Sequence, residues 1–79
     1  MNAFRRKMID SIVAKLQDVY AEFEYVQEKE EEARDNIPES LWETERFEKA
    51  EASVDALQEA ADLFAELVEA LETAKDPDY

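Results

Sequence analysis

The side chains that could carry chemistry in this chain are almost all carboxylates. The 79 residues include 22 Asp and Glu, but no His and no Cys. The commonest general acid–base group and the usual imidazole and thiolate metal ligands are therefore missing. Ser11, Ser40 and Ser53 have no base beside them that would activate a hydroxyl nucleophile. We predict that the chain has no catalytic residues and is not an enzyme.

The carboxylates are also poorly arranged for holding a metal or a cofactor. Glu28, Glu31 and Glu32 could chelate calcium weakly, but no segment has the spacing of an EF-hand loop. A di-iron site in a helical bundle needs Glu-x-x-His pairs, which a chain without His cannot form. The absence of Gly excludes a phosphate-cradling loop and a dinucleotide fingerprint. We predict no metal site, no cofactor-binding residue and no cofactor.

Charge limits the partners that the chain can bind. Its net charge is −13, and Arg5, Arg6 and Lys7 supply three of its nine cations, so residues 8–79 carry six cations against 22 acids, or −16. Such a surface repels nucleic acid phosphates, whereas it suits a basic protein partner. The three early cations are expected to contact the acidic C-terminal end of the second helix. No apolar run is long enough to span a bilayer, and no signal-peptide core follows the basic start, so we expect a cytoplasmic protein without membrane association.

The elements that must position these side chains are helices. Gly is absent, only two Pro occur, and apolar residues recur at steps of three and four. A first helix is predicted over residues 3–34, with a partial second stripe at Val13 and Tyr20. Its expected packing seam is Ile9, Ile12, Leu16, Val19, Phe23 and Val26.

A break between the helices is predicted at residues 36–43. Pro38 lacks an N–H group and ends the first helix, and Asn36 could cap that end in the left-handed conformation. Two starts are open for the second helix: Ser40 with Glu43 as a capping box, or Thr44 as the N-cap.

The second helix, predicted over residues 44–74, has two apolar stripes. The first is Phe47, Ala50, Val54, Leu57, Ala61, Phe64, Val68 and Leu71. The second is Ser53, Ala56, Ala60, Leu63, Leu67, Ala70 and Ala74. Together they make an apolar face that is wider than one partner helix can cover.

These elements predict an all-α fold, an antiparallel two-helix hairpin that forms one domain over residues 1–79 and ends in a disordered tail at 75–79. Two interpretations of the second stripe remain open. It could be covered by a second hairpin, giving a homodimeric four-helix bundle with coiled-coil-like packing, or it could be alanine-rich filler on a monomer. The predicted interface residues are Phe47, Val54, Leu57, Phe64, Leu67, Val68, Leu71 and Trp42. For Trp42 there are two possibilities, an exposed binding anchor or a plug that packs on the hairpin end with Ile37 and Phe47.

Acidic residues follow the remaining side of the second helix, without a basic residue between Ala50 and Ala74. The candidate acidic partner face is Glu51, Asp55, Glu59, Asp62, Glu66 and Glu69. It could engage a basic protein, imitate the phosphates of DNA and so inhibit a nucleic-acid-binding protein, or only keep the chain soluble. The leading hypothesis is a structural or protein-interaction module, and the alternative is a DNA-mimicking inhibitor.

The turn also carries a motif, Asn36-Ile37-Pro38-Glu39-Ser40-Leu41 followed by Glu45-Arg46. In this motif the chain resembles a family of small acidic helical-hairpin proteins of Gram-positive bacteria, their prophages and their conjugative elements. Trp42 and Phe47 stand where that family commonly has Gln and Gly. The resemblance implies the hairpin fold and an origin in a mobile element, and it implies no activity.

Overall fold

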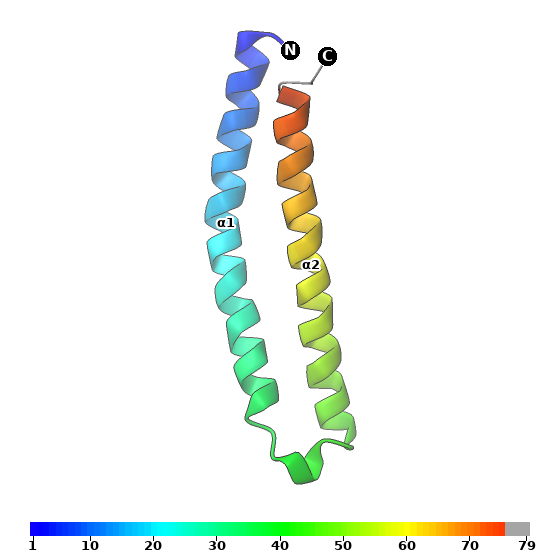
Figure 1. Ribbon diagram of the computed structural model, residues 1–79. Coiled ribbons are helices and arrows are strands. Elements are labelled where there is room, and N and C mark those ends of the chain that lie inside the picture. The colour runs from blue at the N-terminus through cyan, green and yellow to red at the C-terminus, as the bar shows by residue number, and fades with distance from the viewer. Residues whose placement is uncertain (76–79) are drawn as a thin grey trace.

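The protein is an antiparallel hairpin of two long helices, in a computed structural model that describes residues 1–75. Helix α1 spans Ala3–Asp35, a short 3-10 helix η1 spans Glu39–Leu41, and helix α2 spans Glu45–Lys75. The two long helices lie side by side, so that the start of α1 and the end of α2 are at the same end of the hairpin, opposite the turn (Figure 1). The predicted all-α hairpin is confirmed, with helix boundaries within one residue of those expected. Of the predicted tail, Lys75 belongs to α2 and residues 76–79 lie outside the described residues.

The hairpin is a single layer of helices. Its Cα atoms extend over 58 × 23 × 13 Å, and the smallest dimension is close to the diameter of one helix. Each long helix therefore has one helical neighbour, and both broad surfaces of the hairpin are open.

Helix α1 has a side-chain cap at its start and a tightened turn at its end. The side-chain oxygen of Asn2 accepts a hydrogen bond from the Arg5 N–H at 2.9 Å. At the other end Asn36 is the C-cap, but its backbone is right-handed (φ −81°, ψ −6°), so the left-handed cap predicted there is wrong. The Ile37 N–H instead donates to the Arg34 carbonyl at 3.1 Å. Because this 3-10-type bond satisfies a terminal carbonyl, a left-handed residue is not required.

The connection contains the short helix η1, and Thr44 begins α2. Thr44 Oγ1 accepts a hydrogen bond from the Phe47 N–H at 3.4 Å and donates one to the Leu41 carbonyl at 2.6 Å. Of the two possible starts, the structure uses Thr44. This one hydroxyl therefore fixes both the end of η1 and the first turn of α2.

An apolar cluster closes the turn end of the hairpin. Ile37 is buried, and the Trp42 Nε1–H donates to its carbonyl at 3.1 Å. The indole also stacks on Phe47, with ring centroids 5.4 Å apart. Trp42 thus packs where the plug interpretation places it, although 47% of its surface remains exposed.

The seam between the helices differs from the expected one on α1. The buried or half-buried apolar residues of α1 are Ile9, Val13, Leu16, Tyr20 and Phe23. Ile12, Val19 and Val26, predicted to face α2, are instead exposed. Tyr20 makes ring contacts with Phe64 at 4.8 Å and with Phe23 at 5.6 Å. The stripe that contains Tyr20 forms the seam with α2 because its aromatic ring buries more apolar surface than the Val19 side chain could at the same level.

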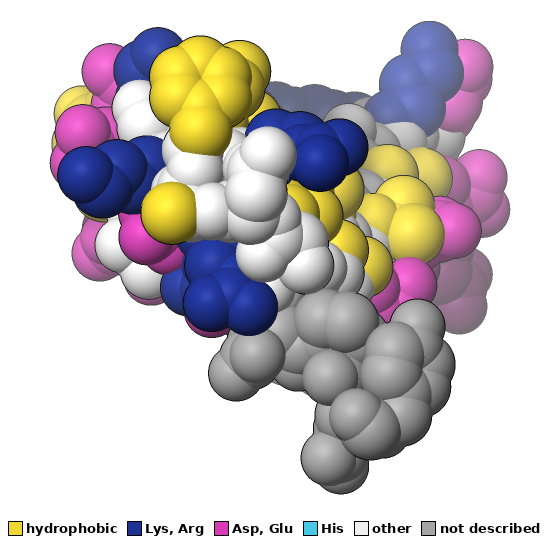
Figure 2. All heavy atoms as spheres, turned by 90° about the horizontal axis from the view of Figure 1, so that it is seen from above, with side chains coloured by type: hydrophobic (Ala, Val, Ile, Leu, Met, Phe, Trp, Pro, Cys, Tyr) yellow, Lys and Arg dark blue, Asp and Glu magenta, His cyan; other side chains and the backbone are white. Residues whose placement is uncertain are grey.

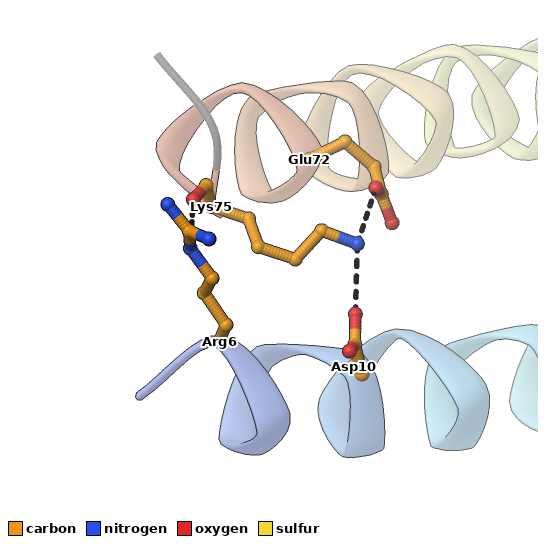
Figure 3. Close-up of polar contacts among 4 residues, drawn as sticks. All are labelled: Arg6, Asp10, Glu72 and Lys75. Carbon is orange, nitrogen blue, oxygen red and sulfur yellow. Dashed lines mark hydrogen bonds and ion pairs between the residues drawn. The ribbon is translucent and has the colours of Figure 1, made fainter. Parts of the chain in front are cut away.

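The described ends of the two helices are held together by polar contacts (Figure 3). The Lys75 ammonium bonds Asp10 of α1 at 2.7 Å and Glu72 of its own helix at 2.9 Å. The Arg6 Nε–H donates to the Lys75 carbonyl at 3.2 Å. The hydrogen bond to Asp10, followed by that to Glu72, raises the pKa of Lys75. Of the three early cations, Arg6 therefore reaches the C-terminal end of α2, which is where a helix favours positive charge.

Candidate interaction surfaces

The observed seam divides the hairpin into two broad faces. Its positions are buried or half-buried residues: Ile9, Val13, Leu16, Tyr20, Phe23, Gln27, Glu30 and Arg34 of α1, and Phe47, Ala50, Val54, Leu57, Ala61, Phe64, Val68 and Leu71 of α2. In an antiparallel pair, residues that directly precede seam positions lie on the same side of the hairpin in both helices, and residues that directly follow them lie on the opposite side. The contacts agree with this rule. Asp10 follows Ile9 and Glu72 follows Leu71, and both carboxylates meet the same Lys75 ammonium.

The side of the preceding residues carries an unpartnered apolar surface, which we name the apolar face. Its members are Ile12, Val19 and Val26 of α1 and Ala56, Ala60, Leu63, Leu67 and Ala70 of α2. Val19 is 51% exposed, Leu63 58% and Leu67 46%. The α2 half is the predicted second stripe. The α1 half had been assigned to the seam, and only the observed contacts of Tyr20 with Phe64 move it to the surface.

The charges divide between the two sides as well. Between residues 8 and 75, the residues that precede seam positions include one acid, Glu22, and four cations, Lys15, Lys29, Arg46 and Lys49. The residues that follow seam positions include no cation and eleven acids. These eleven form the acidic face: Asp10, Glu24, Glu28, Glu31, Asp35, Glu48, Glu51, Asp55, Asp62, Glu69 and Glu72. The net charges are thus +3 and −11. An end-on view shows acidic side chains along the outer flanks and hydrophobic ones between the helices (Figure 2).

The acidic face contains an apolar groove near the middle of the hairpin. Its volume is about 490 Å³, and it is lined by Gln17, Tyr20, Phe64, Ala65, Val68 and Glu69. Ala65, which lies on the same side of the hairpin as Gln17, contributes only a methyl group to the lining. The half-buried residues Tyr20, Phe64 and Val68 form its floor.

The predicted site residues fall in different places. Val54 is completely buried between the helices. Phe47, Leu57, Phe64, Val68 and Leu71 are half-buried in the same seam, whereas Leu67 is on the apolar face and Trp42 is at the turn. Of the acidic row, Glu51, Asp55, Asp62 and Glu69 lie on the acidic face, and Glu59 and Glu66 lie on the outer side of α2. The sequence interpretation missed the acids that α1 adds to that face.

Within residues 1–75, no group of three or more Asp or Glu side chains is arranged to hold a metal ion. In the same range no helix combines the length and apolar character needed to cross a membrane.

Comparisons with protein-family models, with characterised proteins and with solved structures give no significant match to this chain.

Proposed function

We propose that this protein is a non-enzymatic interaction module that works as a homodimer, with the apolar faces of two hairpins packed together into an antiparallel four-helix bundle. The observation that carries the proposal is the apolar face itself. It brings exposed branched side chains of both helices to one side of the hairpin, while eleven acids lie on the other. An exposed apolar surface of this kind is typical of a protein–protein contact.

The surface area of the hairpin supports this assignment. Its accessible surface is 6215 Å², whereas a compact monomer of 9.2 kDa exposes about 4,900 Å². The hairpin therefore exposes about 1,300 Å² more than a compact fold of its mass. A standard interface removes about 800 Å² per partner, so one broad face is large enough to supply it. The buried apolar core of the described residues, Val13, Ile37 and Val54, is small for an independent domain.

A second copy fits the apolar face because the face is symmetric along its length. On α1, Ile12 and Val26 each lie seven residues from Val19. On α2, Leu63 and Leu67 each lie two residues from position 65, and Ala60 and Ala70 each lie five residues from it. The contact between Tyr20 and Phe64 sets Val19 level with position 65, so both patterns share one centre.

This arrangement defines the symmetry of the dimer. A two-fold axis across the hairpin at the level of Val19 places α1 on the partner's α1 and places Leu63 on the partner's Leu67. Lys15 and Glu22 flank Val19 by four and three residues, so the same axis brings each Lys15 to a Glu22 of the other copy. The contacts are both apolar and charge-complementary.

Oxidative cross-linking of a Val19→Cys variant tests the proposal, since the chain has no natural Cys. A residue on a two-fold axis meets its own copy, and a disulfide requires Cα atoms about 4.4–6.8 Å apart. We expect Val19→Cys to form a covalent dimer rapidly at low micromolar concentration. The matched control is Ala21→Cys, which is exposed on the acidic face.

Cross-linking of Ala21→Cys as fast as Val19→Cys would reject the apolar face as the interface. A wild-type chain that sediments as a monomer at tens of micromolar would reject the dimer itself.

A second candidate function, inhibition of a nucleic-acid-binding protein by a chain encoded in a phage or mobile element, is supported by the eleven-acid face. Acids spaced along two rigid helices could follow the path of phosphates in a basic cleft. Capture of a DNA-binding protein from host lysate that duplex DNA then displaces would favour it, and failure to retain any basic protein at physiological salt would exclude it.

A further inference from the structure

The groove on the acidic face differs chemically from the surface around it. Its floor is formed by Tyr20, Phe64 and Val68, and these side chains are only half-buried although they belong to the seam. The groove stays open because Ala65 on one wall is too short to cover Phe64. A shallow apolar groove that runs between two helices is the shape that receives one face of a third helix.

The charges around the groove restrict what could enter it. Glu69 forms part of the wall, and Glu24 and Asp62 lie about one helical turn from lining residues on the same side. Within residues 8–75, none of the residues that directly follow a seam position is a Lys or Arg that could offset these acids. Lys75 pairs with Asp10 and Glu72 of this face, but it does so at the last residue of α2, at the end of the hairpin opposite the turn. An acidic ligand would be repelled here, and a purely cationic one would leave the apolar floor uncovered.

We propose that this groove binds a basic amphipathic helix of a partner protein, with its apolar side chains on Tyr20, Phe64 and Val68 and its Lys or Arg side chains against the flanking acids. The contact with the floor removes apolar surface from water, and the charges steer the approach and fix the orientation of the helix. The groove lies on the side opposite the apolar face. This binding therefore does not compete with the proposed dimer, and it can be measured separately from it.

A synthetic peptide of about 18 residues, built from Leu, Lys and Ala with Leu on one helical face, is a suitable probe. Its binding to the full chain is followed by fluorescence anisotropy of a label on the peptide. A peptide of the same composition in scrambled order keeps the charge and loses the apolar face. Two protein variants complete the design, Ala65→Lys in the groove wall and Ala52→Lys on the exposed outer side of α2. Both substitutions change the net charge equally.

We expect the amphipathic peptide to bind at least roughly tenfold more tightly than the scrambled one. We expect Ala65→Lys to weaken that binding roughly tenfold or more and Ala52→Lys to change it by less than about twofold. Equal affinity for both peptides, or equal loss in both variants, would show attraction of charge alone and overturn the proposal. Sedimentation of Ala65→Lys separates the proposed groove from the proposed dimer. If this variant keeps the oligomeric state of wild type and loses peptide binding, the loss is assigned to the groove.

Discussion

Truncation of Leu63 on the apolar face has a consequence that can be worked out from its exposure. Burying a Leu side chain completely contributes about 1.5–3 kcal/mol, and 58% of Leu63 is still exposed in the single hairpin. Covering it in the dimer therefore contributes about 1 kcal/mol per copy. Two-fold symmetry doubles this to about 2 kcal/mol, so Leu63→Ala should raise the dimer Kd about 30-fold. The hairpin itself should lose little stability, because the truncated atoms are mostly in water.

Sedimentation equilibrium over a range of micromolar concentrations measures this change, and far-ultraviolet circular dichroism checks that helix content is kept. Tyr25→Ala is the matched control, since Tyr25 is 63% exposed and lies on the outer side of α1, away from the apolar face. Its Kd should stay within about twofold of the wild-type value. An unchanged Kd for Leu63→Ala, or an equal change in both variants, would refute the assignment of the apolar face as the interface.

Three further outcomes follow from individual contacts. Lys15→Glu should weaken the dimer because the proposed two-fold axis places Lys15 against Glu22 of the other copy. Adding Glu22→Lys should restore the dimer in sedimentation, and no recovery would argue against the axis. Thr44→Ala should cost about 1 kcal/mol, or about 4–8 °C in Tm, through loss of the cap that receives the Phe47 N–H, whereas Thr73→Ala on the exposed side of α2 should not lower Tm. Lys75→Met should be less stable than wild type near neutral pH. Because folding raises the pKa of Lys75, its contribution is fully present below the ordinary value of 10.5 and is lost as the pH rises above it, so the two thermal unfolding midpoints should converge only in strong alkali.

The sequence was sufficient to predict the hairpin, but it was not sufficient to predict which side of α1 faces α2. Pro38, the absence of Gly and the 3–4 spacing predict two helices and a turn. On α1, however, apolar residues occur in adjacent pairs, such as Ile12 with Val13 and Val19 with Tyr20. Either member of a pair continues the spacing, so periodicity alone cannot choose the seam.

The choice depends on the partner helix, because Tyr20 reaches Phe64 and Val19 does not supply a ring. The same error concealed the division of charge. With Tyr20 in the seam, five of the nine acids of α1 lie on the same face as the acids of α2 that follow seam positions. The groove was beyond prediction for a further reason, since its lining comes from both helices and depends on which residues of α1 lie beside Phe64 and Ala65 of α2.

The two faces together determine what the proposed dimer offers to other molecules. If the apolar faces meet, the two acidic faces point outward on opposite surfaces of the bundle, and each carries its own groove. Because a single hairpin is one helix thick, two packed layers hold the grooves about two helix diameters apart. A dimer could then hold two basic helices at once, and two sites on one rigid body bind a two-site partner more tightly than either site alone. A tandem probe consists of two amphipathic peptides joined by a flexible linker that can reach around the bundle. It should therefore bind wild type more tightly than the single peptide does. At concentrations where the Leu63→Ala variant is monomeric, this variant should lose most of the gain in affinity from the tandem probe and still bind the single peptide like wild type.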